Sequence, residues 1–303
     1  MTELSPHPST WLASFPKSGS TWLRFLVRSL LYGPATCSSE VEADLPSIHE
    51  DQPLSPLRRQ KGRLILTHKT WEAQQALQVP TAGFVLLTRH PVDVVLSDMR
   101  YFLLTQLDDY LRSKGLDTSA VEEHAKRLAS TFLTYLLHNS TTPKQQRLGM
   151  GSWSENVESW LEAGRDHPHV LVRYEDLRQD PLSELGRVAS FLGLSPDRET
   201  LDIATQACSL DAMRQMQERE IREQRPGRFY QARHQAAYNA GLRFVNQGNI
   251  GSAAAFTPEI LERLQALFGE TMTKLGYSIE DGQCRIDAFD PHGETHRAEQ
   301  KAC

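Results

Sequence analysis

The stretch "TWLASFPKSGSTWLRFLVRSLLYG" (10–33) joins a short apolar run, a turn with proline and glycine, and apolar residues at helical spacing. It predicts a strand, a loop and a helix in direct succession. Backbone N–H groups at the start of a helix attract anions, and Lys17 adds a positive charge to the loop. In a nucleotide-triphosphate loop the lysine follows the last glycine and directly precedes Ser or Thr. Here Lys17 precedes Gly19, and Trp22 follows the hydroxyls, so the stretch predicts an anion site of another kind.

Three further compact apolar runs alternate with segments of helical periodicity. They are "GRLILTH" (62–68), "AGFVLLTRHP" (82–91) and "HVLVRYEDL" (169–177). Strands that alternate with helices form a parallel sheet, and ligands of such sheets bind beyond the carboxyl ends of the strands. We therefore expect an α/β fold, a P-loop-type parallel β-sheet flanked by helices, in a single domain of residues 1–278. Residues 279–303 are polar and poorly periodic, which predicts a weakly ordered C-terminal tail.

The composition of the 303-residue chain argues against several classes of partner. Its formal net charge of -5 leaves no overall basic field for nucleic acid or an anionic membrane surface. Apolar runs such as "GFVLL" (83–87) are far shorter than the roughly 20 residues of a membrane span. The start, "MTELSPHPST", lacks the features of a secretory signal, so we expect a cytoplasmic protein. The 4 cysteines and 11 histidines show no metal-ligand spacing, which predicts no metal site.

Polar residues follow two of the predicted strands. Arg89 ends one apolar run, and Ser97 lies in the helix that follows. An arginine and a nearby hydroxyl can hold a phosphate by charge-assisted hydrogen bonds. His68 ends another run, where an imidazole can act as a general base. Taken alone, a strand-end arginine is more often ion-paired and a strand-end histidine more often structural.

Together these motifs resemble a known family. "PKSGSTW" is similar to the 5'-phosphosulfate loop of sulfotransferases that use PAPS (3'-phosphoadenosine 5'-phosphosulfate), and "TRHPVDVVLSDMRYF" is similar to their 3'-phosphate motif. The stretches "LTHKTW", "GSWSENVESW", "VRYEDLRQDP", "FLGL" and "ACSLDAM" follow in the family's order. The resemblance covers about residues 10–275. It is strongest toward the soluble, cytosolic type and, within it, toward bacterial enzymes that sulfate natural products.

The resemblance implies a role for each matching residue. Lys17 contacts the phosphosulfate and stabilises charge on the bridging oxygen, and His68 is the general base. Trp22 stacks on adenine, and Tyr174 reaches the same base. The implied nucleotide-binding set is Lys17, Ser18, Gly19, Ser20, Thr21, Trp22, Arg89, Ser97, Tyr174, Ser209 and Gly248.

Three departures from the family pattern concern the surroundings of the loop. A lysine two places before the histidine is Leu66 here, with Lys69 as a candidate to take over its role. An aromatic opposite the tryptophan is Leu210, so stacking on adenine should be one-sided. In the late loop "NQGNIG" (246–251) the family's two basic residues are Asn and Gln. The candidates for the missing charge are Arg243, Arg228 and Arg233.

The resemblance implies transfer of a sulfuryl group from PAPS to a hydroxyl of a small-molecule or natural-product acceptor, without a metal. The products are a sulfate ester and PAP (3'-phosphoadenosine 5'-phosphate). A small-molecule kinase on the same sheet is an alternative, although the chain has no Gly-Lys-Ser or Gly-Lys-Thr. A PAPS- or PAP-binding protein without catalysis is a second alternative. The sequence leaves the acceptor and the oligomeric state open, with a homodimer as one option.

Overall fold

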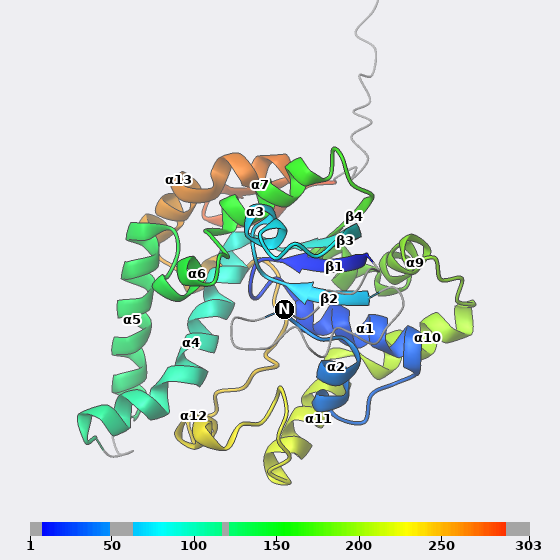
Figure 1. Ribbon diagram of the computed structural model, residues 1–303. Coiled ribbons are helices and arrows are strands. Elements are labelled where there is room, and N and C mark those ends of the chain that lie inside the picture. Colours follow the sequence, from blue (N-terminus) through cyan, green and yellow to red (C-terminus); the bar gives the residue numbers. More distant parts are fainter. Residues whose placement is uncertain (1–7, 49–62, 117–120, 289–303) are drawn as a thin grey trace, which may run out of the picture.

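The computed structural model describes residues 8–48, 63–116 and 121–288. Its centre is a sheet of parallel strands in the order β2-β1-β3-β4, shown in Figure 1. The strands are β1 (Ser9–Ser14), β2 (Arg63–Thr67), β3 (Thr81–Thr88) and β4 (His169–Arg173). Helices cover both faces, so the predicted α/β fold with a parallel sheet flanked by helices is confirmed.

Alternate residues of the strands enter two different hydrophobic clusters, one on each face of the sheet. On β3, Phe84 and Leu86 belong to the first cluster, whereas Val85 and Leu87 belong to the second. Strands that are buried on both faces need apolar residues at successive positions. This requirement explains the continuous apolar runs in the sequence.

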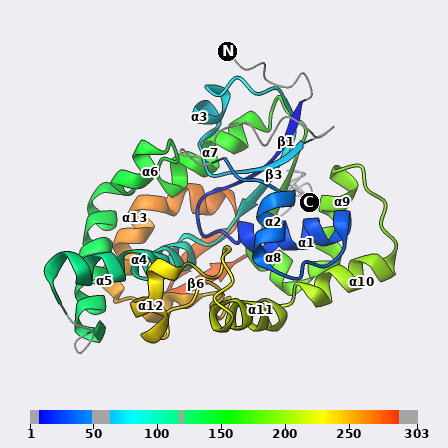
Figure 2. The same cartoon turned by 60° about the horizontal axis from the view of Figure 1, so that its bottom comes forward.

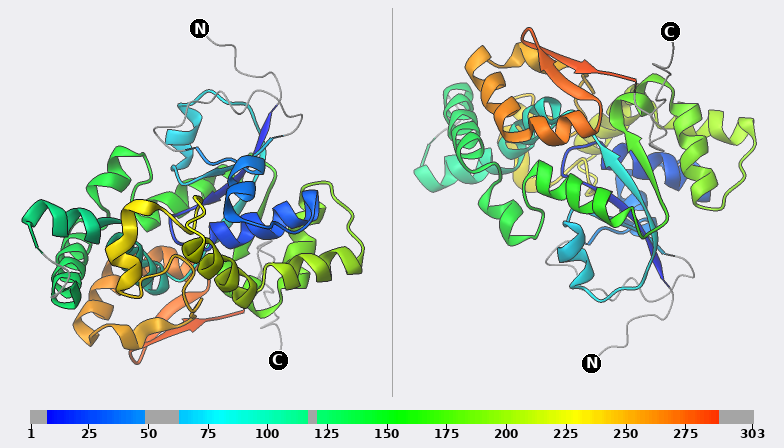
Figure 3. Two further views of the ribbon diagram at one scale, coloured as in Figure 1. Left: turned by 90° about the horizontal axis from the view of Figure 1, so that it is seen from below. Right: turned by 90° about the horizontal axis from the view of Figure 1, so that it is seen from above.

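The two groups of helices lie on opposite sides of the sheet, as Figures 2 and 3 show. The first group consists of α3 (Trp71–Gln75), α4 (Pro91–Lys114), α5 (Val121–Asn139), α7 (Trp153–Ala163) and α13 (Pro258–Lys274). The second group consists of α1 (Ser20–Tyr32), α2 (Ser38–Asp44), α8 (Tyr174–Gln179), α9 (Pro181–Phe191), α10 (Arg198–Ala207) and α11 (Leu210–Arg222).

A third hydrophobic cluster joins the far end of α4 to the segment after α11. Leu107 of α4 packs with Tyr230 and Tyr238 in this cluster. Short helices complete the chain: α6 (Pro143–Arg147), α12 (Gln235–Asn239) and the 3-10 turns Ala232–His234 and Ser252–Ala255. Within the described ranges, no helix combines the length and hydropathy that a membrane span requires.

A β-hairpin ends the described chain. Strands β5 (Tyr277–Glu280) and β6 (Gln283–Ile286) pair antiparallel around Asp281 and Gly282, whose φ angles are 50° and 70°. Two positive φ angles are typical of a tight hairpin turn, for which Asp-Gly is a favoured sequence. The tail expected from residue 279 therefore begins inside regular structure, and residues 289–303 lie outside the described residues.

Candidate functional site

A cavity of about 810 Å³ opens where the carboxyl ends of the strands meet α1, α4 and the late loop. Its volume is typical of a small-molecule site. Its wall includes most of the residues implied by the resemblance: Lys17, Gly19, Ser20, Thr21, Trp22, His68, Arg89, Ser97, Tyr174 and Gly248. Residues far apart in the chain are thus brought to one site.

The turn between β1 and α1 holds an unusual backbone conformation. Lys17 has a φ of 70°, which a residue with a side chain rarely adopts, and Gly19 has a φ of 103°. A Cβ atom at Gly19 would lie 2.5 Å from a ring carbon of Tyr174. Glycine is therefore required here twice, by the backbone angle and by the close approach of the tyrosine.

The Lys17 ammonium lies between two aromatic rings of the cavity wall. Its Nζ is 4.1 Å from the centroid of Tyr101 and 4.5 Å from that of Phe244. Burial lowers the pKa of Lys17 to about 7, although the nearby carboxylate of Asp98 opposes this shift. Burial likewise raises the pKa of Asp98 to about 6. An anion bound beside Lys17 would favour the charged amine.

His68 is oriented by the main chain of β1. Its Nδ1 donates a hydrogen bond to the carbonyl oxygen of Ser14 over 2.7 Å. A carbonyl only accepts, so the neutral ring carries its proton on Nδ1 and leaves the lone pair on Nε2. Asn156 Nδ2 donates to the carbonyl of His68 over 2.9 Å and fixes its backbone. The ring thus has the tautomer that a general base requires.

Arg89 joins the turn, the late loop and Tyr174. Its guanidinium carbon lies 4.2 Å from the centroid of Tyr174. It donates to the carbonyls of Asn249 over 2.7 Å and Lys17 over 3.3 Å. Its Nε is buried and has no hydrogen-bond partner among the described residues. The side chain is therefore held in place, and its Nε–H group remains as a donor for a ligand.

Trp22, Tyr174 and Leu210 form the other end of the cavity. The Trp22 indole N–H donates to the carbonyl of Cys208 over 2.8 Å, which fixes the ring plane. Tyr174 meets Trp22 edge-on, with centroids 5.7 Å apart. A Cβ atom at Gly248 would lie 2.9 Å from the Tyr174 hydroxyl and 3.3 Å from Leu210. One aromatic face and one aliphatic side chain thus border this end of the cavity.

Two residues of the implied nucleotide set do not line the cavity. Ser18 is fully buried, and its hydroxyl has no partner among the described residues. Ser209 is exposed and caps α11, where its hydroxyl accepts from the N–H of Ala212 over 3.3 Å. Their contacts with a nucleotide stay predictions.

The structure also places the residues at the departures from the family pattern. Leu66 is part of the core, with 1% of its surface exposed. Lys69 does not line the cavity, and its ammonium donates to the carbonyl of Leu148 over 2.7 Å. The structure therefore does not bring Lys69 to the cavity, and its taking over from the missing lysine stays an unsupported prediction.

The late loop brings no positive charge of its own. Asn246 lines the cavity but donates its amide to the carbonyl of Arg243 over 3.0 Å, and Gln247 is exposed. Arg243 pairs with Glu218 at 2.6 Å. Neither Arg243 nor Arg233 lines the cavity. Of the three candidates named from the sequence, Arg228 alone does so.

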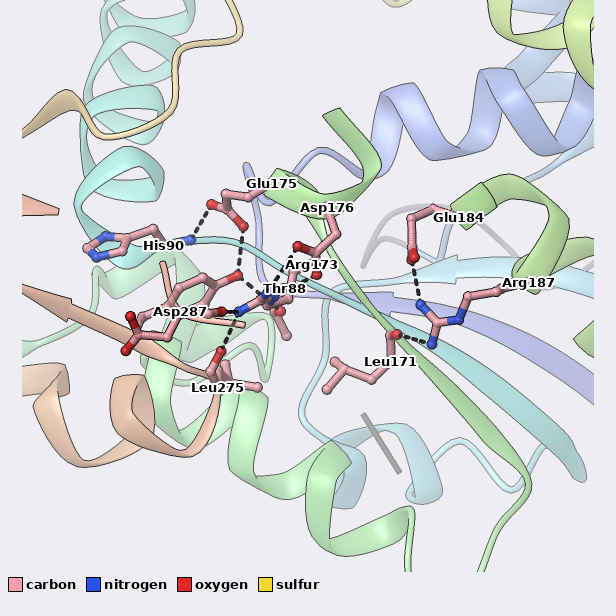
Figure 4. Close-up of polar contacts among 11 residues, drawn as sticks. Thr88, His90, Leu171, Arg173, Glu175, Asp176, Glu184, Arg187, Leu275 and Asp287 are labelled. Carbon is pink, nitrogen blue, oxygen red and sulfur yellow. Dashed lines mark hydrogen bonds and ion pairs between the residues drawn. The ribbon is translucent and has the colours of Figure 1, made fainter. Parts of the chain in front are cut away.

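Two carboxylates that we did not single out hold this site together. Asp93 on α4 accepts from the N–H groups of Gly251 over 2.9 Å and Ser252 over 3.0 Å, which anchors the late loop. Its place in the first turn of α4 is common for an acidic residue, and nothing local in the sequence indicates the late loop as its partner. The second is Glu175, which accepts from the N–H of His90 over 2.9 Å (Figure 4). Glu175 thus links the segments that carry Arg89 and Tyr174.

Tyr101, Phe244, Asp98 and Arg178 are cavity residues that sequence reasoning missed. They come from α4, the late segment and α8, and nothing in their local sequence indicates that they meet. Asp98 accepts a hydrogen bond from Gln145 over 2.9 Å. Among the described residues, no group of three His, Cys, Asp or Glu side chains is placed to hold a metal ion.

Comparisons of the chain with known proteins find relatives with similar sequences. Mouse sulfotransferase 1B1 is 24% identical over 215 residues, which cover 67% of this chain and 64% of the mouse protein. The flavonol 3-sulfotransferase of Flaveria bidentis is 22% identical over 297 residues, which cover 90% of this chain and 85% of that protein. The chain thus spans slightly less than two thirds of the mouse relative.

Solved structures share the fold. Mouse sulfotransferase SULT7A1, complexed with PAP, has a TM-score of 0.58 and 20% identity, and the match covers 88% of this chain and 85% of that one. Retinol dehydratase in a complex with retinol and PAP has a TM-score of 0.61 and 15% identity, over 89% and 82% of the two chains. A family model described as the sulfotransferase domain matches residues 7–276. The chain therefore belongs to the sulfotransferase family.

Proposed function

We propose that the protein transfers a sulfuryl group from PAPS to a hydroxyl of a small-molecule acceptor. The observation that carries this proposal is that His68 and Lys17 line one cavity with Trp22, Arg89 and Tyr174. A candidate base, a cation and candidate nucleotide-binding residues thus line the same cavity. Two of the similar solved structures contain PAP, which supports PAPS as the donor. We also propose that the protein is cytoplasmic and that residues 1–278 form a single domain.

The residues present fit a nucleotide with several phosphate groups. The buried Nε of Arg89 and the buried hydroxyl of Ser18 lack partners among the described residues. Such groups are rare in folded proteins unless a ligand or water satisfies them. Gly19, at the start of α1, lines the cavity together with Lys17, and N–H groups at the start of a helix attract anions. Ser20 and Thr21 add hydroxyl donors on the same wall.

His68 and Lys17 divide the chemistry of the transfer. PAPS supplies an activated sulfuryl group when it is bound. His68 Nε2 accepts the proton of the acceptor hydroxyl as its oxygen forms a bond to sulfur. Lys17 stabilises the negative charge on the phosphate oxygen whose bond to sulfur breaks, and PAP leaves. The positions of both residues are fixed by the main chain of β1 and its turn.

The acceptor end of the cavity lies between α4, α5 and α6. Phe102 and Phe132 present apolar rings there, and Thr131 and Lys144 present polar groups. This mixture suits an acceptor that combines an apolar body with hydroxyl groups. We propose a natural product of this kind, for which phenols and glycopeptide aglycones are suitable probes.

Thermal denaturation with PAP, adenylyl sulfate, or ATP and magnesium tests the nucleotide specificity. Only a ligand that binds the native state raises the melting temperature. We expect a clear shift with PAP and little with ATP, and an absent PAP shift would refute the proposal. Turnover is then measured with PAPS and a panel of phenols, sugars and glycopeptide aglycones. PAP binding without turnover of any acceptor would favour a binding protein without catalysis.

A further inference from the structure

The 3'-phosphate end of the nucleotide site has fewer positive charges on its loop than the motif pattern predicts. Asn246 and Gln247 are neutral, and Arg89 is the remaining cation of the implied phosphate set. A phosphate monoester carries between one and two negative charges near neutral pH. A second cation should therefore reach this end from another element. The arginines that line the cavity are Arg89, Arg100, Arg147, Arg178 and Arg228.

Arg178 lies at the nucleoside end of the cavity. It follows Tyr174 by one turn of α8, so both side chains are on the same face of this helix. Its guanidinium carbon is 5.7 Å from the centroid of Trp22. Burial raises the pKa of Tyr174, and the charges of Arg89 and Arg178 act against that shift. Both arginines are therefore close to this tyrosine.

The Arg178 side chain has a hydrogen-bond donor that no described residue accepts from. Its Nε is buried and has no partner among the described residues, and the same is true of Arg89. Each of the two side chains contacts an aromatic ring instead. Two arginines, each with a buried donor that lacks a partner among the described residues, thus lie near Tyr174, and such donors suit a bound phosphate.

The other arginines of the cavity are placed for other tasks. Arg228 also has a buried Nε without a hydrogen-bond partner among the described residues, but it pairs with Glu42 at 3.4 Å. It lies over the ring of Phe244, as Lys17 does, so it belongs to the sulfuryl end. Arg147 ends α6 at the acceptor end. Arg100 lies on α4 near Ser97, but no contact within the described ranges joins it to Trp22 or Tyr174.

We propose that Arg178 binds the 3'-phosphate of the nucleotide and replaces the charge that the late loop lacks. The inference rests on the proposed function, because it assumes that PAPS and PAP are the nucleotides bound. Recognition of this phosphate has then moved from the late loop to the last turn of α8, the helix that follows β4. A nucleotide without a 3'-phosphate should gain nothing from this side chain.

Isothermal titration with PAP and with AMP, which lacks the 3'-phosphate, tests the inference. R178A should weaken PAP binding by about 10- to 100-fold, the usual effect of losing a charged hydrogen bond, and AMP binding by less than about 3-fold. R178Q keeps part of the aliphatic stem over Trp22 and should also lose the preference for PAP over AMP. If R178A fails to fold, R178Q provides the test. R198A, which removes an exposed arginine of α10, should change neither affinity.

Two further variants sharpen the test. N246R/Q247K in the R178A background should restore the preference for PAP over AMP, because it returns the charge to the loop. R100A removes another arginine of the cavity and should leave that preference intact. An unchanged ratio of PAP to AMP affinity in R178A and R178Q would overturn the inference, as would a ratio that falls in R100A instead. Failure of the wild-type protein to bind PAP would instead refute the proposed function.

Discussion

The hydroxyl of Tyr277 donates a hydrogen bond to the carboxylate of Glu175 over 2.7 Å, and both side chains are buried. This bond connects the C-terminal hairpin to the helix that begins with Tyr174. The other carboxylate oxygen of Glu175 accepts from the N–H of His90, next to Arg89. The hairpin therefore supports two residues of the proposed nucleotide site from behind.

Tyr277→Phe should lower the free energy of unfolding by about 1–3 kcal/mol, because a buried carboxylate loses a donor. The PAP affinity should fall only slightly, since His90 still holds Glu175. Urea denaturation and PAP titration measure the two effects. Tyr32→Phe at an exposed site is the control and should be neutral. A Tyr277→Phe protein as stable as the wild type would contradict the buried role of this bond.

His68→Ala should lower kcat by roughly 10²–10⁴-fold, the usual contribution of a general base. PAP binding should stay within about threefold, because the ring is not part of the implied nucleotide set. His138→Ala removes an exposed histidine of α5 and serves as the control. If the PAP affinity falls together with turnover, His68 is structural and the base is another group.

Nucleotide binding should be accompanied by proton uptake near pH 8. Burial lowers the pKa of Lys17 to about 7 in the free protein, so at pH 8 the amine is mostly neutral. A bound phosphate raises that pKa again, and the amine takes up a fraction of a proton, at most about one. The uptake should vanish toward pH 6, where the free amine is already charged.

Calorimetry of PAP binding in two buffers of different ionisation enthalpy measures this uptake. Lys17→Arg is the matched variant, because arginine stays protonated throughout the range. It should bind PAP without proton uptake at pH 8. Equal uptake in the two proteins would assign the proton to another group.

Gly19→Ala should weaken PAP binding by at least about tenfold and destabilise the fold by more than about 1–2 kcal/mol. The new methyl group would strain the backbone and displace the ring of Tyr174. Gly33→Ala measures the backbone strain alone, because Gly33 has a φ of 80° and no atom lies within 4 Å of the added Cβ. Equal losses of stability in the two variants would show that the ring of Tyr174 moves aside without lowering the free energy of unfolding.

The sequence was sufficient for features that depend on local pattern. The continuous apolar runs predicted parallel strands, and the Gly-containing turn after the first strand lies at the cavity, as the sequence led us to expect. Strand-end residues such as His68 and Arg89 were correctly expected at one edge of the sheet, since all parallel strands end there. The Asp281–Gly282 dipeptide was an equally local signal for the hairpin, and it was overlooked.

Features that depend on long-range packing could not be predicted. The sequence made Lys69 a candidate for catalysis, but its ammonium donates to the carbonyl of Leu148, far along the chain. The two rings around the Lys17 ammonium come from α4 and the segment after α12, so no spacing pattern announces them. The pKa of Lys17 depends on this burial and could therefore not be predicted from the sequence either.

Arg173, at the end of β4, donates to the main-chain carbonyls of Leu275 over 3.1 Å and Asp287 over 2.8 Å. During synthesis, the strand that carries Arg173 leaves the ribosome about a hundred residues before these carbonyls, as their numbers in the sequence show. The guanidinium cannot be paired in this way until the hairpin has emerged. The proposed nucleotide site of a nascent chain should therefore mature late, and an incomplete chain that stalls before the hairpin should depend on chaperones more than the finished protein does.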